Sequence, residues 1–145
     1  MKEIDSEEIR KMLEKSGLKA TYQRICVVDC LMNKFKNKHP TVEMIYNYLH
    51  KNLPVISMTT VYNTVNALRK KDMINALTIT GDETRYDPQI ENHHHLLCKK
   101  CGRVYDIKIK CPLALSNKKT IAGHRINEVC GYFTGICKDC LKEEV

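Results

Sequence analysis

The sequence predicts an α+β protein with a winged helix-turn-helix in its N-terminal part and a strand-rich part after it. Apolar residues recur at helical spacing as far as about residue 71. Two short apolar and β-branched segments separated by turn residues follow, and two CxxC pairs lie further on. The 145 residues suffice for one ordinary domain or two small ones.

Four helices are expected, each beginning at a residue that can cap it. The expected caps are Asp5, with Glu8 closing a capping box, and then Thr21, Thr41 and Ser57. Gly17 is placed to end the first helix. The expected inward faces are Ile9, Met12 and Leu13; Ile25, Val28, Leu31 and Met32; Val42, Ile45, Tyr46 and Leu49; and Val61, Val65 and Leu68.

A β-hairpin is expected directly after the fourth helix. Residues 74–79 are rich in apolar and β-branched types, residues 80–83 have turn composition, and residues 84–87 resume an extended segment. Short helices followed by a hairpin are typical of a winged helix. The expected domains are residues 1–87, a hinge at 88–92, and residues 93–145, where 103–109 is the clearest strand.

Composition sets limits on the partners. The net charge of +7 is compatible with nucleic acid, but the charge is spread over both parts and does not mark a DNA-facing one. No apolar run is long enough to span a membrane, and the polar, acidic N-terminus is unlike a secretory signal. We therefore expect a cytoplasmic protein that does not engage a membrane.

The two CxxC pairs, Cys98 with Cys101 and Cys137 with Cys140, predict a metal site. Two residues between thiolates let both sulfur atoms reach one tetrahedral ion at about 2.3 Å. Four cysteines leave no open coordination position, so the predicted Zn²⁺ is structural rather than catalytic. A redox switch is the alternative, and the doubling of the pair favours zinc.

Four other cysteines have no defined role in the sequence. Cys26 and Cys30 can share a face of the second helix, where small buried hydrophobes are the simplest interpretation. Cys111 and Cys130 can be imagined as a pair, although no pattern supports it.

The triplet His93-His94-His95 precedes the first CxxC pair. In an extended segment His93 and His95 point to one face and His94 to the other. Two imidazoles on one face make half of a site for a first-row metal, and a solvated polar cluster is the alternative.

Several segments, in matching order and spacing, resemble the hallmark motifs of the ferric uptake regulator family from about Ile9 to Cys140. They are Lys38-His39-Pro40-Thr41, Thr59-Thr60-Val61-Tyr62-Asn63-Thr64-Val65, Arg85-Tyr86-Asp87 and His93-His94-His95-Leu96-Leu97-Cys98-Lys99-Lys100-Cys101-Gly102. The resemblance implies a winged-helix domain, a C-terminal α/β dimerisation domain with the four-cysteine zinc, and a regulatory metal site between the domains.

The same resemblance implies the ligands of the regulatory metal. Carried over residue by residue, they are His39, Asp87, His93, His95 and Asp106. Three imidazoles and two carboxylates suit Fe²⁺ or Mn²⁺. Because the ligands come from both domains, the bound metal is expected to set the angle between them and to act as a corepressor. That angle decides whether the two recognition helices of a homodimer match successive major grooves of an inverted-repeat operator.

Two residues resemble the peroxide-sensing branch of the family. That branch carries Asp where Asp87 stands, whereas iron-uptake regulators usually carry Glu, and Asn63 follows the same trend. The branch implies that ferrous iron reacts with hydrogen peroxide and oxidises a histidine ligand, for which His39 and His93 are the candidates. Control of iron uptake by ferrous iron is the alternative, and control by zinc is a further one.

The fourth helix is the expected reader of DNA bases. Its residues near the bases would be Thr59, Thr60, Tyr62 and Asn63. Lys19 matches a family lysine that approaches the minor groove. A metalloenzyme is disfavoured, because the HxE…PCxxC pattern of zinc deaminases is missing. Sequence-independent packaging of nucleic acid would not need a metal site joining two domains. The chain is therefore not expected to be an enzyme.

Overall fold

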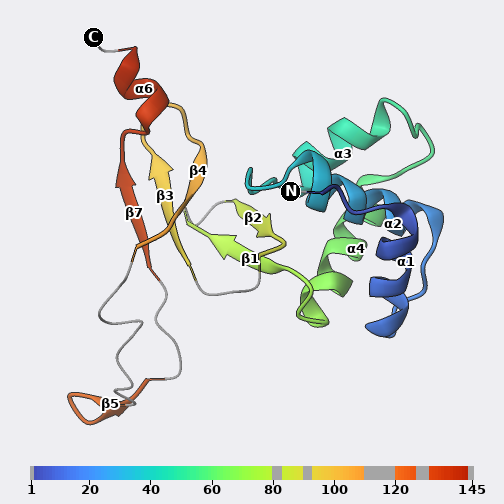
Figure 1. Ribbon diagram of the computed structural model, residues 1–145, viewed down its shortest axis with the longest axis horizontal. Coiled ribbons are helices and arrows are strands. Elements are labelled where there is room, and N and C mark those ends of the chain that lie inside the picture. Colours follow the sequence, from blue (N-terminus) through green and yellow to red (C-terminus); the bar gives the residue numbers. More distant parts are fainter. Residues whose placement is uncertain (1, 80–82, 90–92, 110–119, 127–130, 144–145) are drawn as a thin grey trace. The chain divides into compact units, whose positions relative to one another are not determined.

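The computed structural model describes residues 2–79, 83–89, 93–109, 120–126 and 131–143. The chain divides into two compact units, Met1–Glu91 and Asn92–Val145. The first unit consists of α1 (Ser6–Lys15), α2 (Tyr22–Asp29), a π-helical turn η1 (Cys30–Lys34), α3 (Val42–His50), α4 (Met58–Lys70), β1 (Asn75–Thr78) and β2 (Thr84–Asp87) (Figure 1).

The helices of the first unit begin at the predicted caps. The Asp5 side chain accepts a hydrogen bond from the Glu8 amide at 2.8 Å, and the Glu8 carboxylate accepts one from the Asp5 amide at 3.3 Å. The hydroxyl groups of Thr21, Thr41 and Ser57 each accept from the amide three residues further on. Each contact satisfies an amide that has no partner within its helix.

Gly17 ends α1 by means of its left-handed backbone. Its φ of +76° turns the chain so that its own amide donates to the Glu14 carbonyl at 2.9 Å. The Leu18 amide then donates to the Leu13 carbonyl, also at 2.9 Å. This pair of hydrogen bonds is a Schellman motif, which confirms the predicted end of the helix.

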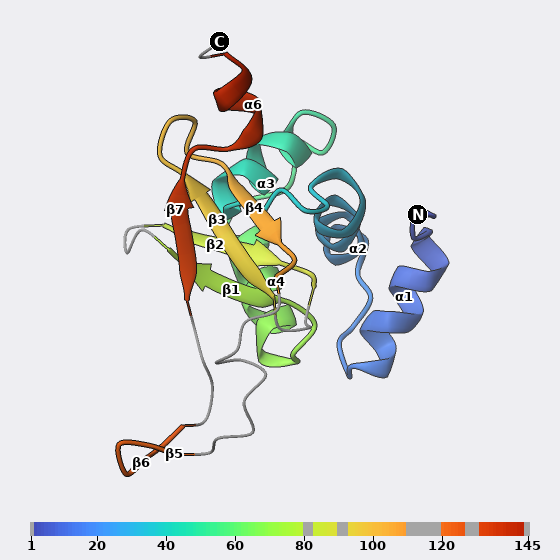
Figure 2. The same cartoon turned by 60° about the vertical axis from the view of Figure 1, so that its left-hand side comes forward.

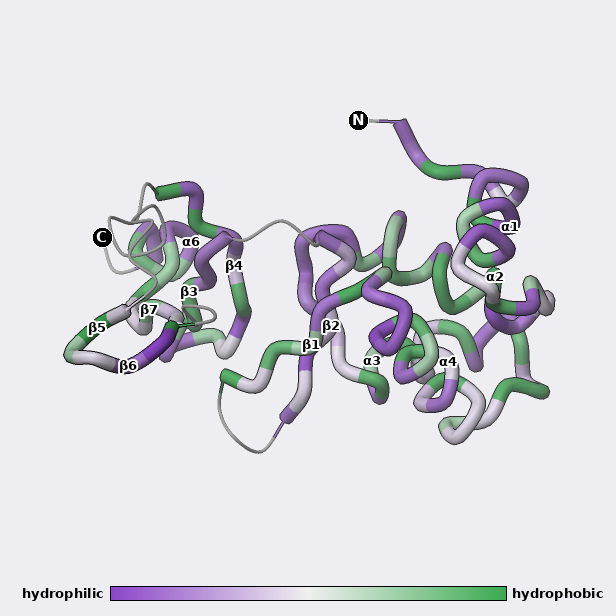
Figure 3. Tube along the Cα trace, turned by 90° about the horizontal axis from the view of Figure 1, so that it is seen from below, coloured by the Kyte–Doolittle hydropathy of each residue, from purple (hydrophilic) through white to green (hydrophobic). Residues whose placement is uncertain are grey.

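The predicted inward faces form the core of the first unit. Ile9, Leu13, Val28, Leu31, Ile45, Val61 and Val65 are 0% exposed, and Ile25, Met32, Leu49 and Leu68 are at most 9% exposed. Met12, Val42 and Tyr46 are partly buried against them, and Val27, which the pattern did not mark, is fully buried as well. In Figure 3, hydrophobic and hydrophilic residues alternate along these helices, as expected for amphipathic elements.

The second helix differs from the expected one at its C-terminal end. A single α-helix was expected to reach Met32, whereas the backbone widens into η1 at Cys30. The Phe35 amide donates to the Cys30 carbonyl at 2.8 Å, which is the hydrogen bond of a π turn. The wider turn keeps Leu31 and Met32 buried while the Phe35 ring packs edge-on against Tyr48, with centroids 5.8 Å apart.

The expected wing is present as the antiparallel pair β1 and β2, in which Ala76 faces Tyr86. Tyr86 is 4% exposed and belongs to the core cluster of the helices. The Tyr86 side chain therefore anchors the hairpin to the helical core. Of the predicted turn at residues 80–83, residues 80–82 lie outside the described residues.

The second unit is built on β3 (His94–Cys98), β4 (Val104–Ile107), β7 (Tyr132–Gly135) and α6 (Lys138–Lys142), with a small pair β5 (Thr120–Ile121) and β6 (His124–Arg125). Figure 2 shows β3 between β4 and β7; it pairs antiparallel with β4 and parallel with β7. Within the segment 103–109 that was expected as a strand, Val104–Ile107 form β4. Cys111 and Cys130 lie outside the described residues.

Replacing Ser57 by Ala removes the cap of α4. We expect the free energy of unfolding of the first unit to fall by about 1 kcal/mol, because the amide of Thr60 loses its acceptor. Urea unfolding followed by circular dichroism measures the change. Ser57→Asp keeps an acceptor and serves as the control; equal losses in the two variants would contradict this account of the cap.

Candidate functional site

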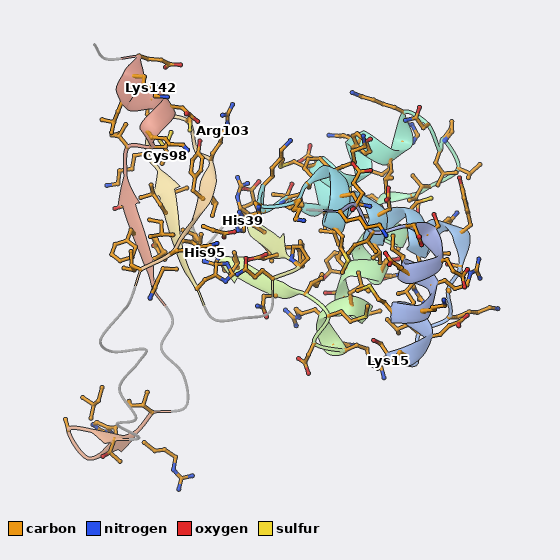
Figure 4. All side chains as sticks on the ribbon, viewed as in Figure 1. Lys15, His39, His95, Cys98, Arg103 and Lys142 are labelled. Atoms are coloured by element: carbon orange, nitrogen blue, oxygen red, sulfur yellow. The ribbon has the colours of Figure 1, made fainter. Side chains whose placement is uncertain are left out.

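Four cysteine sulfur atoms gather at one end of the three-stranded sheet in the second unit. The side chains of Cys98, Cys101, Cys137 and Cys140 each offer a sulfur, and all four lie within 4.8 Å of one another. Cys98 is the last residue of β3, and Figure 4 shows it at the end of the sheet that is next to α6. Cys137 is the N-cap of α6, and Cys140 lies one turn further on.

The turn after β3 brings Cys101 close to the other three cysteines of the cluster. Gly102 has a φ of +71°, and its amide donates to the Cys98 carbonyl at 2.9 Å. The Cys98 amide donates to the Arg103 carbonyl at 2.9 Å, which leads the chain back into β4. A residue other than glycine at position 102 would be strained at that φ.

Hydrogen bonds to sulfur favour thiolates in part of the cluster. The backbone amides of Cys101 and Cys137 lower the pKa of Cys98 to about 6. The Tyr105 hydroxyl donates to the Cys137 sulfur at 3.4 Å and lowers the pKa of that thiol. Burial raises the pKa of Cys140 to about 12, and a bound cation would favour loss of its proton.

The spacing of the sulfur atoms fits a tetrahedral zinc ion. Thiolates at about 2.3 Å from a tetrahedral ion are about 3.8 Å apart. The sulfur atoms of Cys98 and Cys140 are 4.0 Å apart, and those of Cys101 and Cys137 are 3.8 Å apart. All four cysteines carry free thiols, and these distances are far beyond a disulfide bond.

In the first unit, His39 and Asp87 come together although they are far apart in sequence. The His39 Nε2 and Asp87 Oδ2 atoms are 3.5 Å apart, and the two side chains are 0% and 2% exposed. Asp87 is the last residue of β2, and His39 precedes the Pro40-Thr41 segment that caps α3. An imidazole and a carboxylate that are both buried can supply two ligands to a cation.

In the second unit, three further ligand-type side chains come together across β3 and β4. Asp106 Oδ1 is 3.0 Å from His93 Nε2 and 3.4 Å from His95 Nε2. His95 and Asp106 face each other in the antiparallel register, and the His93 and His95 rings are 4.4 Å apart. The His94 ring lies instead 5.8 Å from Phe133, so strand alternation separates it from its neighbours as expected.

Both clusters have the donor chemistry of a site for Fe²⁺ or Mn²⁺. They offer imidazole nitrogens and carboxylate oxygens and no thiolate. The thiolate cluster, by contrast, suits zinc. Hard-to-borderline donors and soft donors are therefore kept apart in this chain.

The face of α4 that points away from the core carries most of the residues expected near DNA. Thr59, Tyr62 and Asn63 are exposed, with Tyr62 at 52%, whereas Thr60 is partly buried. The Thr60 hydroxyl lies 2.9 Å from that of Ser57, so it takes part in the cap of the helix. Lys19 is exposed in the segment between α1 and α2.

The sequence did not single out Arg85 and Tyr105. Arg85 appeared only as part of a motif, yet its guanidinium donates to the His39 carbonyl at 3.1 Å. Strand alternation was the available signal, because it places Arg85 and Asp87 on one face of β2. No such signal pointed to the contact of Tyr105 with Cys137, because β4 and the start of α6 are far apart in sequence.

Among the described residues, no helix is both long and apolar enough to cross a membrane.

These features define a winged-helix protein with a thiolate metal cluster and imidazole–carboxylate clusters. A profile of the "Ferric uptake regulator family" matches residues 15–131, so the chain belongs to this family. It is a metal-responsive regulator by class.

Several proteins of known name are similar to this chain along most of its length. The "Peroxide-responsive repressor PerR" of Staphylococcus epidermidis is 30% identical over 94% of this chain and 91% of its own length. The "Peroxide operon regulator" of Bacillus subtilis is 28% identical over 94% of each chain. The structure of the ferric uptake regulator Fur of Helicobacter pylori covers 100% of both chains with a TM-score of 0.68 at 24% identity, which shows a shared fold.

Replacing Cys98 by Ser tests the thiolate cluster. We expect the purified chain to lose its zinc and its dimeric state, because a structural zinc supplies roughly 10–16 kcal/mol in small sites. Elemental analysis and light scattering measure the two properties. Cys26→Ser, in the first unit, is the control and should keep both. A Cys98→Ser protein that is zinc-free and still a folded dimer would overturn this role.

Proposed function

We propose that this chain is a homodimeric, metal-dependent repressor of transcription that senses hydrogen peroxide. Cys98, Cys101, Cys137 and Cys140 hold a structural Zn²⁺ in this proposal. One regulatory Fe²⁺ or Mn²⁺ binds to His39, Asp87, His93, His95 and Asp106. The observation that carries the proposal is the presence of imidazole–carboxylate clusters in both units, buried in the first unit and partly buried in the second, which offer two and three ligands respectively.

One ion that takes ligands from both clusters would act as a switch. His39 and Asp87 belong to the first unit, and the other three residues belong to the second. The proposed hinge at 88–92 connects domain 1–87 with domain 93–145. An ion that binds only one relative arrangement of the domains shifts the population towards that arrangement. In this proposal the regulatory metal ion is the corepressor, because it favours the domain arrangement that binds DNA.

The proposed readout is the spacing of two α4 helices in the dimer. α4 would enter the major groove with Thr59, Tyr62 and Asn63 near the base edges, while Lys19 approaches the minor groove. A two-fold dimer matches an operator that is an inverted repeat. Tyr132 and Phe133 on β7 are 48% and 44% exposed, and exposed aromatic side chains on this strand support a subunit contact in the second unit.

Replacing Tyr62 by Ala tests the DNA-facing helix. Selection from random-sequence DNA with Mn²⁺-loaded protein first identifies the operator. We expect Tyr62→Ala to weaken operator binding by roughly tenfold or more and to relax base preference, because a side chain that contacts bases is lost. Fluorescence anisotropy at two salt concentrations measures both effects, since phosphate contacts make binding steeply salt-dependent. An unchanged affinity and preference would remove α4 from the interface.

The peroxide part of the proposal rests on Asp87 and on the named functions of the relatives. Bound ferrous iron would supply the one-electron chemistry that cleaves the O–O bond of hydrogen peroxide close to its ligands, and any electron that it gives would be returned by the imidazole that is oxidised. The residue oxidised is His39 or His93. Its imidazole C–H is converted to an oxo form that retains one peroxide oxygen, and the second oxygen leaves as water. The imidazole loses two electrons and peroxide gains two.

An oxidised imidazole is a poorer ligand, so the metal leaves and the domains lose the arrangement that binds DNA. The reaction consumes its own side chain and is not turnover; the chain is therefore a sensor and not an enzyme in this proposal. Repression of iron-uptake genes by ferrous iron is the competing function, since it uses the same ligands without the oxidation. A zinc-responsive repressor is a further alternative.

Mass spectrometry of Fe²⁺-loaded protein before and after mild peroxide separates these functions. We expect one added oxygen on the peptide containing His39 or His93, and none in Mn²⁺-loaded protein, because Mn²⁺ does not readily reduce peroxide. If neither histidine gains oxygen, peroxide sensing fails and control of iron uptake takes its place.

Asp87→Glu is the sharpest variant for this question. It keeps the charge, and one added methylene moves the carboxylate by about 1.5 Å. We expect Mn²⁺-dependent DNA binding to survive and histidine oxidation to slow, because the oxidation depends on the geometry that the shorter side chain leaves at the metal. Equal oxidation rates for wild type and Asp87→Glu would show that Asp87 does not set peroxide sensitivity.

A further inference from the structure

His39 has a backbone conformation that its sequence disfavours. Its φ is +49°, in the left-handed region, although it is not glycine and is followed by Pro40. A non-glycine residue seldom adopts this region, and the residue before a proline is biased towards extended backbone. The side chain is also fully buried. Such a conformation persists only when surrounding contacts determine it.

Strand β2 provides those contacts. The Arg85 guanidinium donates through Nη1 to the His39 carbonyl at 3.1 Å, and the Tyr86 amide donates to the Pro40 carbonyl at 3.0 Å. Two successive carbonyls of the His39–Pro40 segment are thus held by two successive residues of the wing. Figure 4 shows His39 beside β2.

The same strand face contacts both the backbone and the side chain of His39. Arg85 and Asp87 are two residues apart and therefore share a face. Arg85 holds the backbone carbonyl of His39, and Asp87 Oδ2 lies 3.5 Å from its Nε2 atom. A second guanidinium nitrogen, Nη2, is 3.0 Å from Glu83 Oε2, which orients the Arg85 side chain. That side chain is 19% exposed, so the contact with Glu83 is partly shielded from water.

We propose that Arg85 is a positioning residue for the regulatory metal, because it holds the left-handed backbone that aims the His39 imidazole at Asp87. Arg85 does not itself bind metal. It raises the fraction of molecules in which His39 is ready to bind, and the apparent affinity for the ion rises with that fraction. This inference rests on the proposed function of His39 and Asp87 as metal ligands.

The guanidinium is suited to this role by its shape. Its planar fork places donors on two sides, so one residue can hold the His39 carbonyl and the Glu83 carboxylate together. Lysine has a single ammonium on a flexible chain and is expected to keep only part of the effect. The role also joins the wing to the metal site, since β2 carries Arg85, Tyr86 and Asp87 in a row.

The test uses full-length, zinc-loaded protein and Mn²⁺ as the probe. Arg85→Met keeps the length and apolar stem and removes every donor. We expect Mn²⁺ to bind roughly tenfold more weakly, because a hydrogen bond from a charged donor is lost. Arg85→Lys should recover part of the loss, and Glu83→Gln should weaken binding by only about threefold. Competition with a fluorescent chelator measures affinity, while zinc content and thermal unfolding check folding.

Arg24→Met is the matched control. The Arg24 guanidinium also donates to a backbone carbonyl, that of Lys19 at 2.8 Å, but Lys19 carries no proposed metal ligand. The Arg24→Met variant should bind Mn²⁺ with the same affinity as wild type. A loss as large as that of Arg85→Met would mean that removing any such arginine disturbs the first unit, and it would overturn the positioning role.

A double-mutant cycle distinguishes positioning from general stabilisation. If Arg85 acts through His39, Arg85→Met should cause no further loss of Mn²⁺ affinity in a His39→Ala background. In an Asp106→Asn background, it should still cause most of its tenfold loss. Equal losses in the wild-type and His39→Ala backgrounds would overturn the proposal.

The outcomes separate this inference from the proposed function. If His39→Ala alone leaves Mn²⁺ affinity unchanged, His39 is not a ligand and the proposed metal site fails together with the role of Arg85. If His39→Ala weakens binding but Arg85→Met does not, only the positioning role fails. Should Arg85→Met fail to fold, Glu83→Gln in the two backgrounds carries the same test; an unchanged affinity in Glu83→Gln then counts against the role.

Discussion

The second unit depends on the contact among its four cysteine sulfur atoms. Its buried cluster in the described residues consists of Cys98, Cys137 and Cys140 packed against Tyr105, rather than of large aliphatic side chains. This cluster joins the end of β3 to the start of α6, and so it connects two segments that are distant in sequence. Among the described residues this unit buries little apolar surface, and in the proposed function a cation shared by the thiolates would supply the missing stability.

The cysteine cluster and the imidazole–carboxylate cluster of the second unit share strand β3. Strand β3 starts at His94 and ends at Cys98, so one strand carries residues of both clusters. Its pairing with β4 sets His95 opposite Asp106. The turn at Gly102 connects the two strands. Both clusters of this unit therefore depend on the pairing of β3 with β4. The two clusters differ in chemistry and are mechanically linked by one strand.

The first unit follows a different principle. Its core of aliphatic side chains from four helices and Tyr86 of the wing does not require a metal. His39 and Asp87 lie at the edge of that core, on a cap segment and a strand end, where a few hydrogen bonds decide the backbone. Local metal binding can then change the position of these segments without unfolding the helices. A core that folds independently of the metal ligands suits the proposed metal-dependent repressor.

The sequence by itself determined the local features. Caps at Asp5, Thr21, Thr41 and Ser57 could be predicted because each involves groups only three residues apart. The separation of His94 from His93 and His95 follows from strand alternation, and the doubled CxxC pattern identified the sulfur cluster. Tertiary structure alone decided the contact of Tyr105 with Cys137 and the hydrogen bond from Arg85 to the carbonyl of the left-handed His39. These features depend on contacts between segments brought together by folding, and neither spacing nor residue type encodes such contacts locally.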